Sequence, residues 1–93
     1  MKITALRIEL FIKESQSLKD KRRVIKSLIE RIKNRYNVSI AEVGDNDSYK
    51  KSTIGLALVS NDVKFNDRQV KEILDFIDAN PLVMIIKSET EIW

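Results

Sequence analysis

The fold is decided by residues 4–35, which read TALRIELFIKESQSLKDKRRVIKSLIERIKNR. At the start of this stretch, large aliphatic residues recur at every second position: Leu6, Ile8, Leu10 and Ile12. A period of two is typical of a β-strand with one buried face. Ser17 is then a suitable helix N-cap, and Asp20 three positions later completes a short capping box. Apolar residues at helical spacing follow, which predicts a helix from Leu18 to about Arg35.

Three further strands and one helix are expected in the remainder of the chain. Residues 37–44 and 52–60 alternate as the first strand does, and a turn rich in Asp and Asn joins them. Asn66 is predicted to cap a second helix, which ends before Pro81 because the residue preceding proline disfavours helical backbone. Residues 82–92 form the last predicted strand.

The resulting order, β-α-β-β-α-β, predicts a ferredoxin-like α+β sandwich in which two right-handed crossovers place both helices on one face of a four-stranded antiparallel sheet. The 93 residues suffice for a single domain, residues 1–93. By alternation, the helix-free face carries mostly small or apolar side chains, and its interface candidates are Ala5, Arg7, Glu9, Ala41, Val43, Ala57 and Val59. Such a face marks an interface with a second copy or another protein, or it is a half-hydrated surface with scattered apolar residues.

The composition excludes several kinds of chemistry. The chain has no cysteine and no histidine, which removes disulfides, thiolate nucleophiles, Cys/His zinc sites and imidazole bases. Gly44 and Gly55 are the only glycines, so no phosphate-binding loop is present. Asp45, Asp47 and Glu42 cluster near the predicted turn, but their spacing matches no calcium loop. We therefore predict no catalytic residue, no metal and no cofactor.

Positive charge is concentrated at the start of the chain. Residues 1–36 hold eleven Lys/Arg and four Asp/Glu, whereas residues 37–93 hold six and ten, for a total net charge of +3. On a helical wheel of about 100° per residue, one flank of the first helix carries a basic stripe that only Glu30 interrupts: Lys19, Arg22, Arg23, Lys26 and Lys33. Glu30 is placed to pair with Lys26 or Lys33.

The position of this stripe suggests a polyanion partner. Its first members, Lys19, Arg22 and Arg23, lie where the helix dipole slightly disfavours cations. A bound phosphate backbone explains their presence, and a solvated helix face is the alternative. Lys50 and Lys51, on the hairpin between the second and third strands, either extend a nucleic-acid surface or remain solvated.

Lys21 falls on the apolar side of the first helix. We expect its alkyl stem to cover the core and its ammonium to reach solvent, in preference to a role as a catalytic amine. The first ten residues are interrupted by charge too early for a signal peptide, and no apolar run is long enough to span a membrane. A cytoplasmic location without membrane partners is therefore expected.

Several strings together resemble the YlxP-like family of short bacterial proteins, and they stand here at residues 7–10 (RIEL), 17–23 (SLKDKRR), 38–44 (VSIAEVG) and 59–62 (VSND). The resemblance covers nearly the whole chain and implies a ferredoxin-like fold. It implies little about activity, since the family carries a domain of unknown function. In some bacteria the gene lies beside genes for translation initiation and ribosome maturation, which is an association and not a mechanism.

These observations favour a non-enzymatic module that binds RNA or the ribosome through Lys19, Arg22, Arg23 and Lys26. The alternative is a homodimeric structural or regulatory protein that associates through its helix-free sheet face and binds no nucleic acid.

Overall fold

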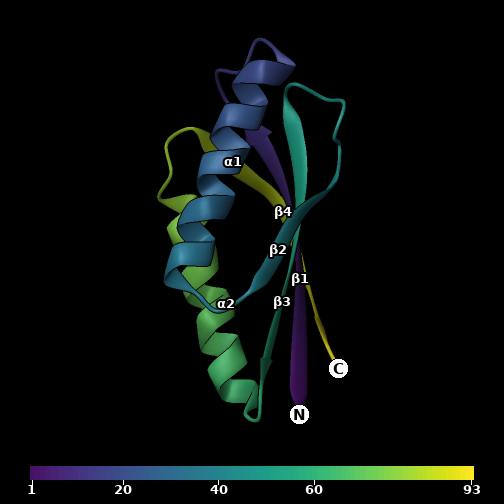
Figure 1. The fold of residues 1–93 in the computed structure, drawn as a ribbon, viewed down its shortest axis with the longest axis vertical. Helices are drawn as coiled ribbons and strands as arrows, with labels where there is room; N and C mark the ends of the chain where they lie inside the picture. Colours follow the sequence, from purple (N-terminus) through teal and green to yellow (C-terminus); the bar gives the residue numbers. More distant parts are fainter.

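The computed structural model describes residues 1–93, and its elements follow the predicted order (Figure 1). The bounds of the elements are β1 (Lys2–Ile12), α1 (Leu18–Arg35), β2 (Ser39–Gly44), β3 (Lys51–Ser60), α2 (Val63–Asp78) and β4 (Val83–Ile92). The strands form one antiparallel sheet in the order β2-β3-β1-β4. Both helices lie on one side of this sheet (Figure 1). The predicted ferredoxin-like α+β sandwich is thereby confirmed.

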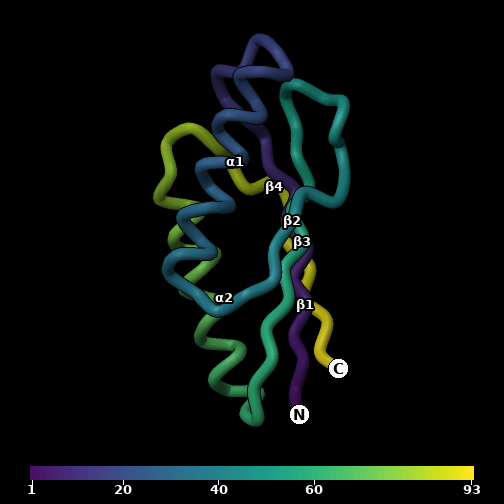
Figure 2. The backbone as a smooth tube through the Cα atoms, in the orientation of Figure 1, coloured from purple at the N-terminus to yellow at the C-terminus, as the bar shows by residue number.

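The core lies between the sheet and the two helices. β1 pairs with both β3 and β4, so its alternate residues lie at the centre of the buried face. Fifteen buried apolar side chains form one cluster: Leu6, Ile8, Leu10, Ile12, Ile25, Leu28, Ile32, Ile40, Ile54, Leu56, Leu58, Val70, Ile73, Ile77 and Val83. The two ends of the chain lie near each other (Figure 2), and reciprocal backbone hydrogen bonds join Ile3 to Trp93.

The start of α1 is built as its sequence predicts. The Ser17 hydroxyl accepts a hydrogen bond from the Asp20 backbone N–H at 3.1 Å. The Asp20 carboxylate in turn accepts one from the Gln16 N–H, also at 3.1 Å. The first contact satisfies an amide group that the helix itself leaves without a partner, and the second ties the residue before the cap to the first turn.

The predicted N-cap of α2, Asn66, is wrong by four residues. The helix begins at Val63 and Asp62 is its cap, because the Asp62 carboxylate accepts a hydrogen bond from the Lys64 N–H at 2.9 Å. Asn66 lies inside the first turns, and its side chain is fully buried. Its amide points to β1 and donates to the Lys2 carbonyl at 3.4 Å. Asn66 therefore joins α2 to the sheet and does not cap the helix.

β4 is an irregular edge strand. Its pairing with β1 shifts register between Glu9 and Leu10, which places a bulge in the ladder. Three of its apolar side chains are about half exposed: Met84, Ile86 and Ile92. β2, the other edge strand, has a similar shift where Glu42 and Gly44 pair with β3. Neither edge of the sheet is therefore a regular, flat strand.

Neither α1 nor α2 combines the length and the apolar character needed to cross a bilayer.

Candidate nucleic-acid interface

Charge is distributed very unevenly between the two helices. α1 carries eight Lys/Arg and two Asp/Glu, whereas α2 carries three and four. One of the eight cations, Lys21, is buried in an ion pair. The other seven make no ion pair with any carboxylate. The exposed surface of α1 therefore keeps its positive charge.

The structure brings together only two of the four predicted α1 contacts. Arg22 and Lys26 line a groove between α1 and β2. Arg23 lies on the other flank, where it borders hollows that include Val24 and Leu82. Lys19 is exposed in the first turn. A ligand on the β2 side of α1 therefore meets Arg22 and Lys26, and Arg23 faces away from it.

The groove between α1 and β2 has a volume of about 480 Å³. Ile25 and Ile29 form its apolar floor, and the rest of its lining is charged: Arg22, Lys26, Lys33, Glu30 and Glu42. Lys33 joins the two candidate cations here, as its position on the stripe predicts. The expected pairing of Glu30 with Lys26 or Lys33 does not form. All three side chains are exposed, so solvent screens the attraction and leaves them apart.

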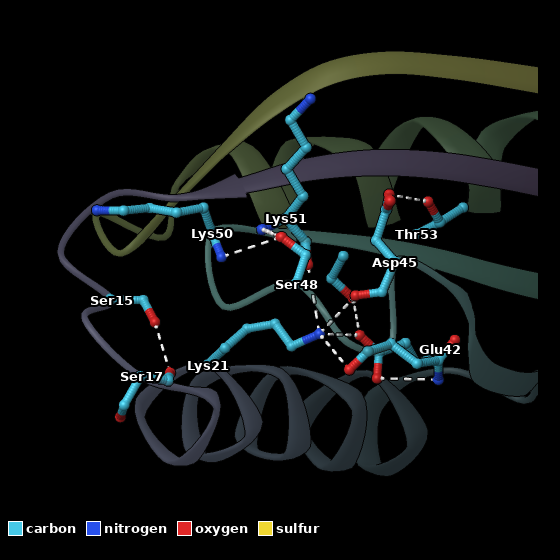
Figure 3. A network of polar contacts seen from close by, with 11 residues as sticks. Ser15, Ser17, Lys21, Glu42, Asp45, Ser48, Lys50, Lys51 and Thr53 are labelled. Atoms are coloured by element: carbon cyan, nitrogen blue, oxygen red, sulfur yellow. Dashed lines mark hydrogen bonds and ion pairs between the residues drawn. The ribbon is translucent and has the colours of Figure 1, made fainter.

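The prediction that the Lys21 ammonium group reaches solvent is wrong. The whole side chain is buried, with 0% exposure, and the ammonium does not reach solvent. Its Nζ donates to the Glu42 carboxylate at 2.9 Å and to the Asp45 carbonyl at 2.9 Å (Figure 3). The carbonyls of Asn46 and Lys51 lie at 3.3 Å. The β2–β3 hairpin thus folds over the end of this side chain, which makes Lys21 a structural anchor.

Sequence reasoning missed the Lys21–Glu42 pair, although a signal was present. Glu42 follows Ile40 by two positions, so alternation turns it toward the helices. There it also accepts a hydrogen bond from the Ser52 hydroxyl at 2.6 Å. A carboxylate on the buried face of an edge strand, opposite a lysine on the apolar side of a helix, indicates such a pair.

The hairpin lysines do not continue the α1 surface. Figure 3 shows the Lys51 side chain extending away from α1, and alternation along β3 places it on the face opposite buried Ser52. The Lys50 ammonium lies 5.5 Å from the centre of the Tyr49 ring. Two of the three carboxylates near the turn have other partners, because Asp45 accepts from the Thr53 hydroxyl at 2.9 Å and Glu42 accepts from Lys21 and Ser52. No group of three or more metal-ligating side chains forms here or elsewhere.

All seven interface candidates lie on the helix-free face and are exposed or half-buried: Ala5, Arg7, Glu9, Ala41, Val43, Ala57 and Val59. β4 adds charges beside them, since Glu89 lies opposite Arg7 in the register of the sheet and Lys87 lies opposite Glu9. A hydrogen bond between Lys87 and Glu89 raises the pKa of Lys87 and lowers the pKa of Glu89. This face therefore has a small apolar half over β2 and β3 and a charged half over β1 and β4.

The fold and this surface define a small ferredoxin-like α+β protein with a basic first helix. The chain belongs to the family described as "Protein of unknown function (DUF503)", which matches residues 3–90. It is 35% identical over 83 residues to "Uncharacterized protein YlxP" of Bacillus subtilis (strain 168), an alignment that covers 89% of this chain and 90% of that protein. The family resemblance seen in the sequence is thereby confirmed.

Three solved structures align with nearly the whole of this chain, with TM-scores between 0.44 and 0.49. The de novo designed protein Foldit4 aligns with a TM-score of 0.47 and 21% identity, over 99% of this chain and 92% of its own. A REP-associated tyrosine transposase bound to a REP hairpin aligns with a TM-score of 0.49 and 14% identity, over 98% and 55%. A dimeric ferredoxin-like protein from an uncultured marine organism gives 0.44 and 14%, over 99% and 92%.

Proposed function

We propose that this chain is a non-enzymatic RNA-binding module that acts on RNA or on the ribosome through the basic flank of α1. The observation that carries the proposal is the set of exposed cations on α1 that have no carboxylate partner. α2 has more acidic than basic residues, so the positive field lies on one side of the helical layer. Such a field attracts a phosphate backbone and accelerates its association.

The spacing of the cations suits an extended polyanion. Lys19, Arg22, Lys26 and Lys33 follow one flank of α1, and at about 1.5 Å per residue the row spans about 21 Å. Contacts to phosphates fix the position of a nucleic acid without reading its sequence. Specificity for a particular RNA therefore comes from the shape of the RNA or from a protein partner.

Salt-dependent binding of a labelled RNA hairpin with a single-stranded tail tests this proposal. If three phosphates are neutralised, raising salt from about 50 to about 200 mM weakens binding about 20- to 40-fold. The triple variant Lys19/Arg22/Lys26→Glu should abolish binding.

The matched control reverses three cations on α2, Lys64/Arg68/Lys71→Glu, and alters the net charge by the same amount. It should retain most of the affinity of the unaltered protein, because only its long-range charge has changed. Equal loss in both triple variants would show nonspecific attraction and refute the α1 surface. No binding by the unaltered protein would refute the function itself.

The second candidate is a homodimer formed through the helix-free face. Val43 and Val59 are 57% and 60% exposed there, which leaves apolar surface uncovered. The neighbouring charges alternate in sign, so a two-fold contact that sets Arg7 of one copy against Glu9 of the other forms two equivalent ion pairs. Sedimentation should then give a dimer mass that Ala57→Glu reduces to a monomer mass and the control Ala79→Glu does not. A monomer at every concentration, or a dimer that survives Ala57→Glu, would exclude this interface.

A further inference from the structure

The groove between α1 and β2 combines its cations with an apolar floor. This floor is formed by half-buried Ile29 above the buried Ile25. The volume of the groove, about 480 Å³, falls within the range of sites that hold small organic molecules. A purely electrostatic strip for phosphates needs no such floor, since phosphates remain in contact with water. The groove therefore fits a flat, partly apolar group positioned beside a phosphate.

Glu30 is the second unusual feature of this groove. Its carboxylate is exposed and makes no hydrogen bond or ion pair, although it lies between Lys26 and Lys33 along α1. A phosphate placed along the stripe would be repelled by this carboxylate. The other groove carboxylate, Glu42, is already bound by Lys21 and Ser52. Glu30 is thus the acceptor available to a ligand that carries hydrogen-bond donors.

Resting on the RNA-binding function proposed above, we infer that the groove between α1 and β2 takes one unpaired base of single-stranded RNA, with Glu30 accepting hydrogen bonds from its edge. A duplex turns the edges of its nucleobases inward and presents a backbone of phosphates and hydroxyls. It therefore leaves the apolar floor of the groove uncovered and brings negative charge toward Glu30. The face of an unpaired nucleobase covers the exposed part of the Ile29 side chain. The Arg22 guanidinium is placed to stack on such a ring or to bind its phosphate.

Guanine fits this arrangement best. Its N1–H and its 2-amino group lie side by side on one edge, so both can donate to the two oxygens of a single carboxylate. Uracil has one donor on that edge, flanked by two carbonyl oxygens that repel a carboxylate. In adenine and cytosine an acceptor nitrogen adjoins the single amino group. The groove therefore favours a single-stranded segment with an accessible guanine.

Binding of defined oligonucleotides tests the inference. The probes are a uridine oligonucleotide, the same strand with one central guanosine, and a hairpin with an equal number of phosphates whose loop is a non-nucleotide linker, so that every base is paired. The guanosine strand should bind about tenfold more tightly than the all-uridine strand, as expected for a bidentate contact. The hairpin should bind more weakly than the guanosine strand.

The variant Glu30→Gln should remove most of the guanosine preference and strengthen binding of the hairpin, because a repulsive charge is lost. The matched control is Asp67→Asn on α2, which removes one exposed negative charge away from the groove and should preserve the preference. Thermal unfolding should not change in Glu30→Gln, since Glu30 has no partner in the fold.

The outcomes separate this inference from the function on which it rests. If no RNA binds, or if binding ignores the α1 charge reversals, both fail. If RNA binds through α1 but the hairpin and the guanosine strand bind equally, the groove does not hold an unpaired base. The same conclusion follows if Glu30→Gln leaves the guanosine preference intact.

Discussion

Replacing Lys21 with methionine is the most informative perturbation of the fold. Methionine retains much of the volume of the lysine stem, so the change removes the ammonium with little loss of packing. Glu42 then loses its ion-pair partner, and the carbonyls of Asp45, Asn46 and Lys51 lose a donor. The hairpin end of the sheet should be destabilised together with the start of α1.

The magnitude follows from what remains around the carboxylate. Removing one partner of a buried ion pair costs about 3–5 kcal/mol. The Glu42 side chain keeps 19% exposure and still accepts from Ser52, at 2.6 Å, and from Asn46, at 3.4 Å. These donors favour the lower end of the range, so we expect a loss of about 3 kcal/mol. For a domain of this size the corresponding fall in Tm is about 12–24 °C.

Urea denaturation followed by far-UV circular dichroism measures this loss. Lys26→Met is the matched control, because it removes an exposed lysine of the same helix, and its effect should stay within about 0.5 kcal/mol. Glu42→Gln should cost about 2 kcal/mol alone, and the double variant with Lys21→Met should cost less than the sum of the two, with a coupling of about 2 kcal/mol. The anchor role of Lys21 would be refuted by additive effects, or by a Lys21→Met loss no larger than that of Lys26→Met.

Three further predictions concern local features. Thr4 has a fully buried hydroxyl without a hydrogen-bond partner, so Thr4→Val should raise the free energy of unfolding by about 1 kcal/mol; a destabilised variant would contradict this. Asp45 has a positive φ of 57° and accepts from the Thr53 hydroxyl, so Asp45→Ala should lose about 2 kcal/mol in the same assay, whereas Asp45→Asn should lose less than half as much. An NMR titration should place the pKa of Glu89 below its usual 4.5, because Lys87 donates a hydrogen bond to it, and Lys87→Met should return that pKa to normal. Since the folded-state pKa is lowered, the small stabilisation from this exposed pair is present above pH 4.5 and is lost as the pH falls through the lowered value.

The architecture was predictable because local signals agreed with the tertiary structure. Alternation in β1 and the Ser17 cap of α1 both act within a few residues, and the structure confirms both. The start of α2 was not predictable in this way, because Asp62 and Asn66 are both acceptable caps by residue type. Burial of Asn66 against β1 decides between them, and that contact joins residues far apart in the sequence.

The candidate site was predictable only in its composition. A helical wheel places Arg22, Lys26 and Lys33 on one flank, but it cannot say which neighbouring strand completes a groove with them. The same limit applies to Lys21, whose position on the apolar side was evident while its partner on β2 was not. By contrast, the face that Lys51 takes was predictable, because alternation along β3 places it with Ala57 and Val59 on the helix-free face.

The edge strand β4 has a consequence for how copies of this protein behave when crowded. Its outer backbone groups are free to form hydrogen bonds with a strand of another molecule. Such pairing would also bury apolar side chains that are now exposed, those of Met84, Ile86 and Ile92. The bulge and the charges of Lys87 and Glu89 work against it, since they break the register and resist desolvation. The Lys87–Glu89 ion pair should thus protect against aggregation even though it adds little to folding stability. Neutralising both charges should leave the fold intact and make concentrated solutions prone to fibrillar, cross-β assembly.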